Sequence, residues 1–206
     1  MNRFNASNSQ AVFRSRFAAC ATAFAAACML SGSLSAAKVT PPPVPPALQP
    51  PVGNEAFLKG HAIGTQNYLC LSFGADTAWT LITPQATLFS DNDKQIMTHF
   101  RSPNPLEDGT ARLTWQDSDD TSAVWTVPSA IGASRADAIP WQLVRVVGAQ
   151  NGPVGGDDKL AQTTFIQRLN TSGGVAPSTG CARPSDVNRE AFVPYEADYF
   201  FYKAAR

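Results

Sequence analysis

Histidine is scarce in this sequence, and its scarcity argues against a metal site. The 206 residues include only two histidines, His61 and His99. A zinc site needs three or four ligands at local spacings such as H-E-x-x-H, and no such spacing occurs. The aspartate-rich stretches, such as residues 117–120, lack the glycine and the closing glutamate of a calcium-binding loop, so they predict solvated turns. We therefore expect no bound metal.

The glycine-rich fingerprints of nucleotide enzymes are missing as well. The nearest approach is TTFIQRLNTSGGVAPSTGC, residues 163–181. A phosphate-binding P-loop requires G-x-x-x-x-G-K-[ST], whereas five residues separate Gly174 from Gly180, and Cys181 stands where the lysine would be. No G-x-G-x-x-G follows a strand, and no G-x-S-x-G marks a nucleophilic serine. We therefore expect no cofactor, and the glycines predict a turn.

An excess of charge of either sign is also absent. Charged residues make up 16% of the chain, and 16 lysines and arginines balance 16 aspartates and glutamates. Three of the basic residues and none of the acidic ones lie within the first 37 residues, so the chain without that stretch carries a net charge of −3. Because no basic patch stands out, we expect no nucleic-acid partner.

The first 37 residues have the order typical of a secretory signal peptide. Arg3, Arg14 and Arg16 precede the short apolar run AACATAFAAACML, which is followed by the small residues SGSLSAA. The apolar run is shorter than the roughly 20 residues that span a membrane, so we expect cleavage and no stable membrane insertion. Cleavage after Ala37 and lipoprotein processing at Cys28 are the two alternatives. Both predict a secreted or periplasmic protein.

Two cysteines remain beyond the predicted signal peptide. In an oxidising compartment, Cys70 and Cys181 are most simply joined as a disulfide. The alternative, two free thiols or a redox pair, lacks the C-x-x-C spacing that tunes thiol reactivity. We therefore expect a disulfide with 110 residues between its two cysteines.

Proline is concentrated in one segment. Seven of the 16 prolines lie in PPPVPPALQPP, residues 41–51. Such a run lacks backbone donors and favours an extended polyproline II conformation. We expect a proline-rich linker over residues 38–53, acting as a semi-rigid spacer or disordered arm, and then a single β-rich domain over residues 54–206.

Short β-rich runs alternate with turn signals through this domain, and no long stretch places apolar residues at helical spacing. The pattern predicts an all-β fold with little helix, an antiparallel sandwich or barrel of about nine strands. LTWQ and AVWTV flank the turn DSDDTS and predict a hairpin in which Trp115 and Trp125 face each other. The expected strands are IGTQNYLCLSF, TAWTLI, QATLFS, KQIMTHF, ARLTWQ, SAVWTVP, WQLVRVVG, QTTFIQRLN and YEADYFFYK.

Several of these segments resemble a known family. The likeness is carried by GTQNYLC, WTLITPQATLF, THFRSPNP, AIPWQLVRVVGAQ, TTFIQRLNTSGGVAPSTGC and FVPYEADYFFYK. Together they are similar to domain of unknown function 3455, a family of secreted bacterial and fungal proteins, over about residues 60–203. The resemblance implies export, but it implies no catalytic residues because the family has no established activity.

The tryptophans are the first candidates for a ligand site. Flat aromatic rings stack against sugars and other ligands, and the indole donor fixes orientation. Tryptophan in a β-fold is usually part of the core, so we expect two or three of the four to be core residues. Trp115 and Trp125 are the two that we expect to be most informative.

Three polar residues complete the candidate set. His99 lies in an expected strand and is most simply a hydrogen-bonded structural histidine. Arg168 is either exposed or paired with Asp198 or Glu196. Asp198 and Glu196 share one strand face and form the best carboxylate pair for glycoside hydrolysis, although two exposed charges explain the pattern equally well.

These features favour a secreted binding or interaction module for a carbohydrate or another small envelope-associated ligand. The alternatives are an extracytoplasmic hydrolase that uses Asp, Glu or His, and a structural envelope protein. The absence of catalytic motifs favours binding or structure over catalysis.

Overall fold

Secondary structure in the described part of the chain is almost entirely β. The computed structural model describes residues 38–206 apart from residues 134, 154, 156 and 157, so the predicted signal peptide lies outside the described residues. The helices within this part are two single 3-10 turns, η1 (Pro46–Leu48) and η2 (Pro184–Asp186). None of the described helices has the length and apolar character needed to cross a membrane.

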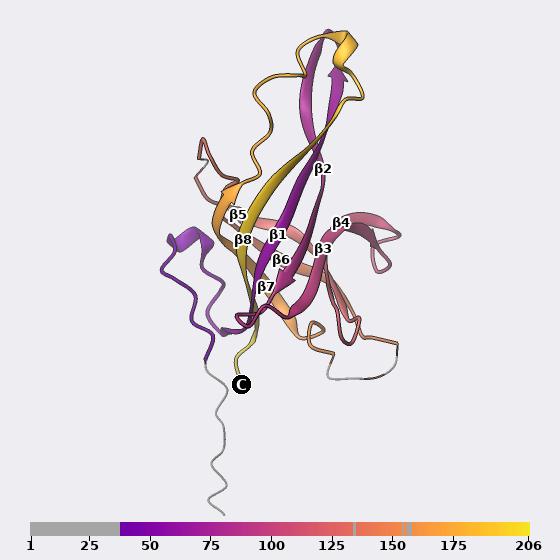
Figure 1. Cartoon of the computed structure of the whole chain (residues 1–206). Coiled ribbons are helices and arrows are strands. Elements are labelled where there is room, and N and C mark those ends of the chain that lie inside the picture. The colour runs from indigo at the N-terminus through magenta and orange to yellow at the C-terminus, as the bar shows by residue number, and fades with distance from the viewer. Residues whose placement is uncertain (1–37, 134, 154, 156–157) are drawn as a thin grey trace, which may run out of the picture. The chain divides into compact units, whose positions relative to one another are not determined.

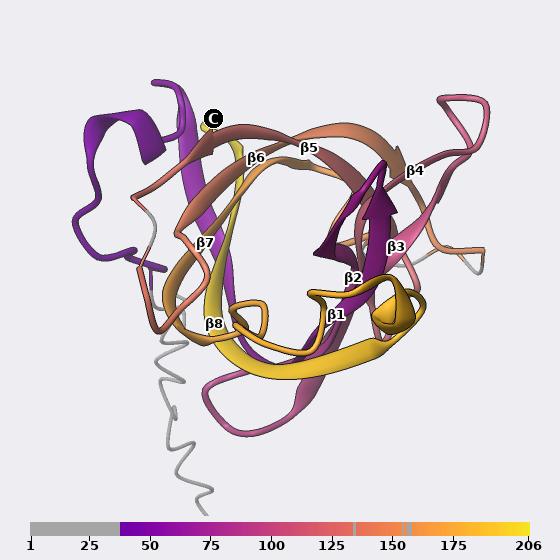
Figure 2. The same ribbon diagram turned by 90° about the horizontal axis from the view of Figure 1, so that it is seen from above.

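Eight antiparallel strands form a closed barrel in which each strand pairs with its neighbours in the sequence (Figures 1 and 2). The first and last strands pair at fifteen residue positions and close the barrel. The all-β prediction is therefore confirmed, with the barrel as the architecture. The strands are β1 (Asn54–Phe73), β2 (Asp76–Phe89), β3 (Gln95–Asn104), β4 (Thr110–Asp117), β5 (Ala123–Ile131), β6 (Gln142–Gln150), β7 (Thr163–Gly173) and β8 (Glu190–Ala204).

The nine predicted strands become eight because TAWTLI and QATLFS are the two halves of β2. Pro84 lies between these halves, yet β2 pairs with β1 on both sides of it. Proline is tolerated there because β3 does not pair with β2 at that position, and the missing amide interrupts no second ladder. The predicted hairpin around DSDDTS is present as β4 and β5.

Alternating side chains of the strands fill the barrel interior. Small residues of β1 and β2 lie beside large residues of the other strands. Gly64 is required for this close approach, because a Cβ there would lie 2.5 Å from the Cα of Ala86. The apolar side chains that point inward pack together as the core of the barrel. Its largest fully buried side chains include Trp115, Tyr199, Phe201, Leu88 and Met97.

Residues 38–53 lie on the outer side of β7 and β8, and we call them the N-terminal strap. Val44 packs against the cluster formed by Phe200 and Tyr202. Leu48 is only 1% exposed, and its carbonyl accepts a hydrogen bond of 2.5 Å from Gln167 Nε2. The expectation of a spacer or disordered arm did not include these contacts, by which the strap covers the second aromatic face of β8.

The β1–β2 hairpin extends beyond the barrel wall as a projecting arm (Figure 1). The pairing of β2 with β3 ends at Ala86 and His99, and beyond this point β2 pairs only with β1. We define the arm as residues 64–73 of β1, 76–85 of β2 and 190–194 of β8. It is a three-stranded ribbon with β1 in the middle.

A covalent bond ties the loop over residues 174–189 to the arm. The predicted disulfide between Cys70 and Cys181 is present. The Trp79 indole donates a hydrogen bond of 2.9 Å to the Thr179 carbonyl, and the Cys70 amide donates one of 2.9 Å to the Arg189 carbonyl. The segment that raised the question of a phosphate cradle is thus a turn held by a disulfide.

Candidate functional site

The two candidate tryptophans lie on opposite faces of the barrel wall. Trp115 pairs with Val124 across the β4–β5 hairpin, and Trp125 pairs with Thr114. Successive residues of a strand point to opposite faces, so the one-residue difference in register places Trp115 in the interior and Trp125 outside. The prediction that the two tryptophans face each other was therefore wrong.

His99 is a buried structural residue of the interior. Its Nδ1 donates a hydrogen bond of 2.9 Å to the Thr114 carbonyl, and its ring stacks on Trp115 with 3.9 Å between centroids. Burial, aided by the nearby positive charge of Arg168, lowers the pKa of His99 from 6.5 to about 3. The ring is therefore neutral at neutral pH and cannot supply a proton as a general acid.

Arg168 points into the same end of the barrel. Its Nε and Nη2 donate hydrogen bonds of 3.2 and 2.9 Å to the Pro140 carbonyl. Together with His99, Trp115 and Tyr199 it lines an internal cavity of about 10 Å³. Because that volume holds about one water molecule, this internal cavity is too small for an organic ligand.

Asp198 lies on the outer face of β8, away from Arg168. It accepts hydrogen bonds from His61 Nδ1 at 3.1 Å and from Asn170 Nδ2 at 2.8 Å. The suggested ion pair between Arg168 and Asp198 is therefore wrong, because the two side chains point to opposite faces of the wall. Of the five candidates, His99, Trp115 and Arg168 meet at the small internal cavity, whereas Trp125 and Asp198 lie apart on the outer face.

Two adjoining hollows cross the wall from β1 to β6, and we call them together the outer groove. The first has a volume of about 670 Å³ and lies where β2 and β3 separate. The second has a volume of about 550 Å³ and lies over β3, β4 and β5. Phe100 lines both, so the two hollows meet at this side chain.

Strand register arranges the lining of the outer groove in two rows. The first runs from β2 to β6 through Thr87, Thr98, Gln116, Ala123 and Gln150. The second contains Phe100, Thr114 and Trp125. Neighbouring strands lie about 4.8 Å apart, so five strands extend the first row over about 19 Å. The groove is therefore long enough for an oligomeric ligand.

Hydroxyl groups hold Trp125 in the groove wall. Its Nε1 donates a hydrogen bond of 2.9 Å to Ser102 Oγ, which lies 2.8 Å from Thr114 Oγ1. Trp125 itself is only 6% exposed, whereas Phe100 is partly exposed. Phe100 therefore offers the more accessible aromatic face, with Trp125 as a fixed support.

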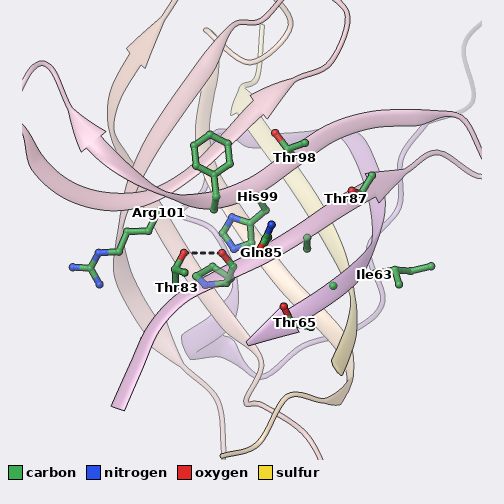
Figure 3. Close-up of a pocket in the computed structure, with 12 residues that line it drawn as sticks. Ile63, Thr65, Thr83, Gln85, Thr87, Thr98, His99 and Arg101 are labelled. Carbon is green, nitrogen blue, oxygen red and sulfur yellow. Dashed lines mark hydrogen bonds between the residues drawn. The ribbon is translucent and has the colours of Figure 1, made fainter. Parts of the chain in front are cut away.

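The lining of the outer groove is nearly free of charge. Among the described residues, the ionisable groups that line either hollow are Arg101 and the buried His99, and no described carboxylate does so. Figure 3 shows the Arg101 side chain extending away from the other labelled residues of the first hollow. The neutral lining combines threonine, glutamine, serine and asparagine with the rings of Phe100 and Trp125 and with small or aliphatic residues such as Ile63 and Ala123. It can bind through hydrogen bonds and stacking, but it offers no acid–base pair.

A cation site is not evident in the part of the chain that the structure describes. No group of three or more His, Cys, Asp or Glu side chains is placed there to hold a metal ion.

A family model described as protein of unknown function (DUF3455) matches residues 51–203. The chain belongs to this family. Membership in DUF3455 confirms the resemblance found in the sequence, and the match begins within the N-terminal strap. No curated protein and no solved structure matches the chain. The candidate site of this DUF3455 protein therefore rests on its geometry.

Sequence reasoning found Trp125 but missed most of the groove around it. Alternation within KQIMTHF places Thr98 and Phe100 on one face, and alternation within QATLFS places Thr87 opposite Leu88. This signal was present in the sequence. The separation of β2 from β3, which creates the first hollow, has no local signature.

Proposed function

We propose that this protein is an exported binding module whose outer groove holds a neutral carbohydrate chain. The observation that carries the proposal is the lining, in which Phe100 and Trp125 lie among neutral hydrogen-bonding side chains and no described residue contributes a carboxylate. A sugar presents apolar ring faces and hydroxyl groups together. Aromatic rings complement the first, and amide and hydroxyl side chains complement the second.

Hydrolysis of the same ligand has less support. A glycoside hydrolase needs two carboxyl groups flanking the bond that it cleaves, and the described lining of the two hollows contains none. Asp198 and its partner His61 do not line either hollow. His99, the remaining candidate, is buried and neutral. We therefore favour binding over catalysis.

Export supports an extracellular ligand. The leader pattern of residues 1–37 is typical of a signal peptide, and the disulfide between Cys70 and Cys181 is typical of an oxidising compartment. Cell-envelope and extracellular polysaccharides are the neutral polymers that a protein meets there.

Binding can be tested by screening the chain without residues 1–37 against neutral and anionic polysaccharides, using affinity electrophoresis and isothermal titration calorimetry. We expect binding of a neutral polymer, with oligomers bound more tightly than the monosaccharide. Phe100→Ala and Gln116→Ala should each weaken binding about tenfold, equivalent to about 1.4 kcal/mol.

Leu106→Ala provides the matched control. Leu106 is 67% exposed in the β3–β4 turn and lines neither hollow, so its removal should leave the affinity unchanged. Failure of every neutral polysaccharide to bind would contradict the proposal. So would a Phe100→Ala variant that binds as the wild type does.

A further inference from the structure

The arm presents a long unpaired strand edge. Residues 76–85 of β2 pair with β1 on one side, and β3 pairs with β2 only from Ala86 onward. No backbone hydrogen bond from any other described segment reaches these residues. An unpaired edge of this length offers a row of free amide and carbonyl groups to another strand.

This edge lacks the charged side chains that usually protect against strand pairing. Natural edge strands are blunted by charged side chains, above all lysine, by proline, by β-bulges or by coverage with another element. From Thr77 to Ser90 the sequence TAWTLITPQATLFS contains no charged residue. The β-bulge at Ile82 and Pro84 limit pairing toward the barrel end of the edge and leave the stretch from Thr77 to Leu81 regular.

Apolar side chains gather on the same arm. Leu81 is 44% exposed on β2, and Ile82 beside it is similarly exposed. Phe73 at the tip of β1 and Phe192 on β8 are more than half exposed. Large apolar groups at one place on a surface mark an interaction site.

The arm is also held in shape before any partner arrives. The disulfide at Cys70, together with the hydrogen bond from Trp79 to Thr179, fixes the ribbon against the loop that precedes β8. A preorganised edge loses little conformational entropy on association.

We propose that the arm is a dimerisation surface on which β2 pairs antiparallel with β2 of a second copy of this chain. Such a contact is isologous, so each residue opposes residues of the same short segment in the partner. Like charges directly opposite one another destabilise a strand pair, and the uncharged segment from Thr77 to Thr83 avoids this penalty. The pairing joins two three-stranded ribbons into one six-stranded sheet.

The test is the mass of the chain without residues 1–37, measured by light scattering and analytical ultracentrifugation from micromolar to millimolar concentration. The wild type is expected to reach twice the mass of one chain. The double variant Leu81→Lys/Ile82→Lys places four positive charges at the pair and should have the mass of one chain throughout. Leu106→Lys, which puts the same charge on an equally apolar but distant position, should remain a dimer.

Hydrogen exchange locates the contact. Amides of residues 77–83 should gain protection as the wild-type concentration rises, while amides of β5 should not change. A wild type with the mass of one chain at all concentrations overturns the proposal, and so does a lysine variant that stays dimeric. Sedimentation of the wild type with neutral lipid vesicles, lost in the lysine variant, would assign the arm to a lipid surface instead.

Discussion

The imidazole of His99 lies inside the barrel without an acidic partner. Burial favours the neutral ring and outweighs the hydrogen bond to the Thr114 carbonyl, which favours the protonated one, so the pKa of His99 falls to about 3. In the unfolded chain a histidine has a pKa of about 6.5. Between these two values the unfolded chain binds a proton that the folded chain does not. Stability from this residue is therefore complete above pH 6.5 and falls as the pH is lowered toward 3.

We predict that His99→Gln makes the stability of the protein less sensitive to acid. Glutamine keeps a donor for the Thr114 carbonyl but does not titrate in this range. Between pH 6.5 and pH 4.5 the wild type should lose about 2 kcal/mol more unfolding free energy than the variant. Urea unfolding at the two pH values measures the difference, and the carboxylates common to both proteins cancel. Equal losses in the two proteins would contradict the buried neutral state.

Residue types alone predicted the role of His99 but not the faces on which Trp115 and Trp125 lie. His99 in a strand was expected to be structural, and it is hydrogen-bonded and buried. Trp115 and Trp125 were expected to face each other, but the composition of a hairpin does not fix the register of its two strands. A shift of one position sends a side chain to the other face of the wall. The pairing of Trp125 with Thr114 is therefore known only from the structure.

The N-terminal strap is the element whose role was hardest to foresee. Proline composition predicts extended backbone, and the residues flanking η1 are indeed extended, with Gln49 at φ −75° and ψ 132°. Composition does not tell whether an extended segment has a surface to cover. That surface, formed by Phe200 and Tyr202, comes from β8, about 150 residues later in the chain.

We predict that Leu48→Ala lowers the unfolding free energy by about 2 to 3 kcal/mol, because the side chain is buried and its removal leaves a cavity. Chemical denaturation of the purified protein measures this. Leu106→Ala removes the same atoms from an exposed turn and should change stability by less than about 0.5 kcal/mol. Equal effects of the two substitutions would show that the strap does not contribute to the folded state.

The strands themselves were largely predictable, because alternating polarity with turn residues between runs is a local signal. The sequence predicts two strands on either side of Pro84, because proline usually ends a strand. β2 continues through Pro84 because β3 does not pair with β2 at that position, so the missing amide breaks no hydrogen bond to β3. A sandwich and a barrel have the same local pattern. The choice between them depends on the pairing of β1 with β8, which is a property of the complete sheet.

At the scale of the whole molecule, the disulfide links the arm to the segment that leads into β8. Cys70 and Cys181 are 111 positions apart, so the bond restricts a large part of the unfolded chain. Chain entropy then assigns the bond up to about 4 to 5 kcal/mol of stabilisation. The predicted disulfide is present, and its sequence signal was simple because only two cysteines follow residue 37.

We predict that the double variant Cys70→Ser/Cys181→Ser unfolds at markedly lower denaturant concentration than the wild type, with a loss of up to about 4 kcal/mol. The loop over residues 174–189 should then exchange its amide hydrogens faster than the barrel strands do. Denaturation curves combined with hydrogen exchange test both statements. An unchanged midpoint would mean that the bond adds nothing to the stability of the fold.

The pairing of β1 with β8 also governs the order in which the protein can form. Asn54 pairs with Ala204, 150 positions along the chain, and contacts so distant in sequence form slowly because loop closure must come first. A polypeptide that stops before Glu190 keeps bare strand edges on β1 and β7, which are prone to aggregate. The barrel is therefore completed only after β8 has been synthesised, and we expect a polypeptide truncated before Glu190 not to reach the native fold.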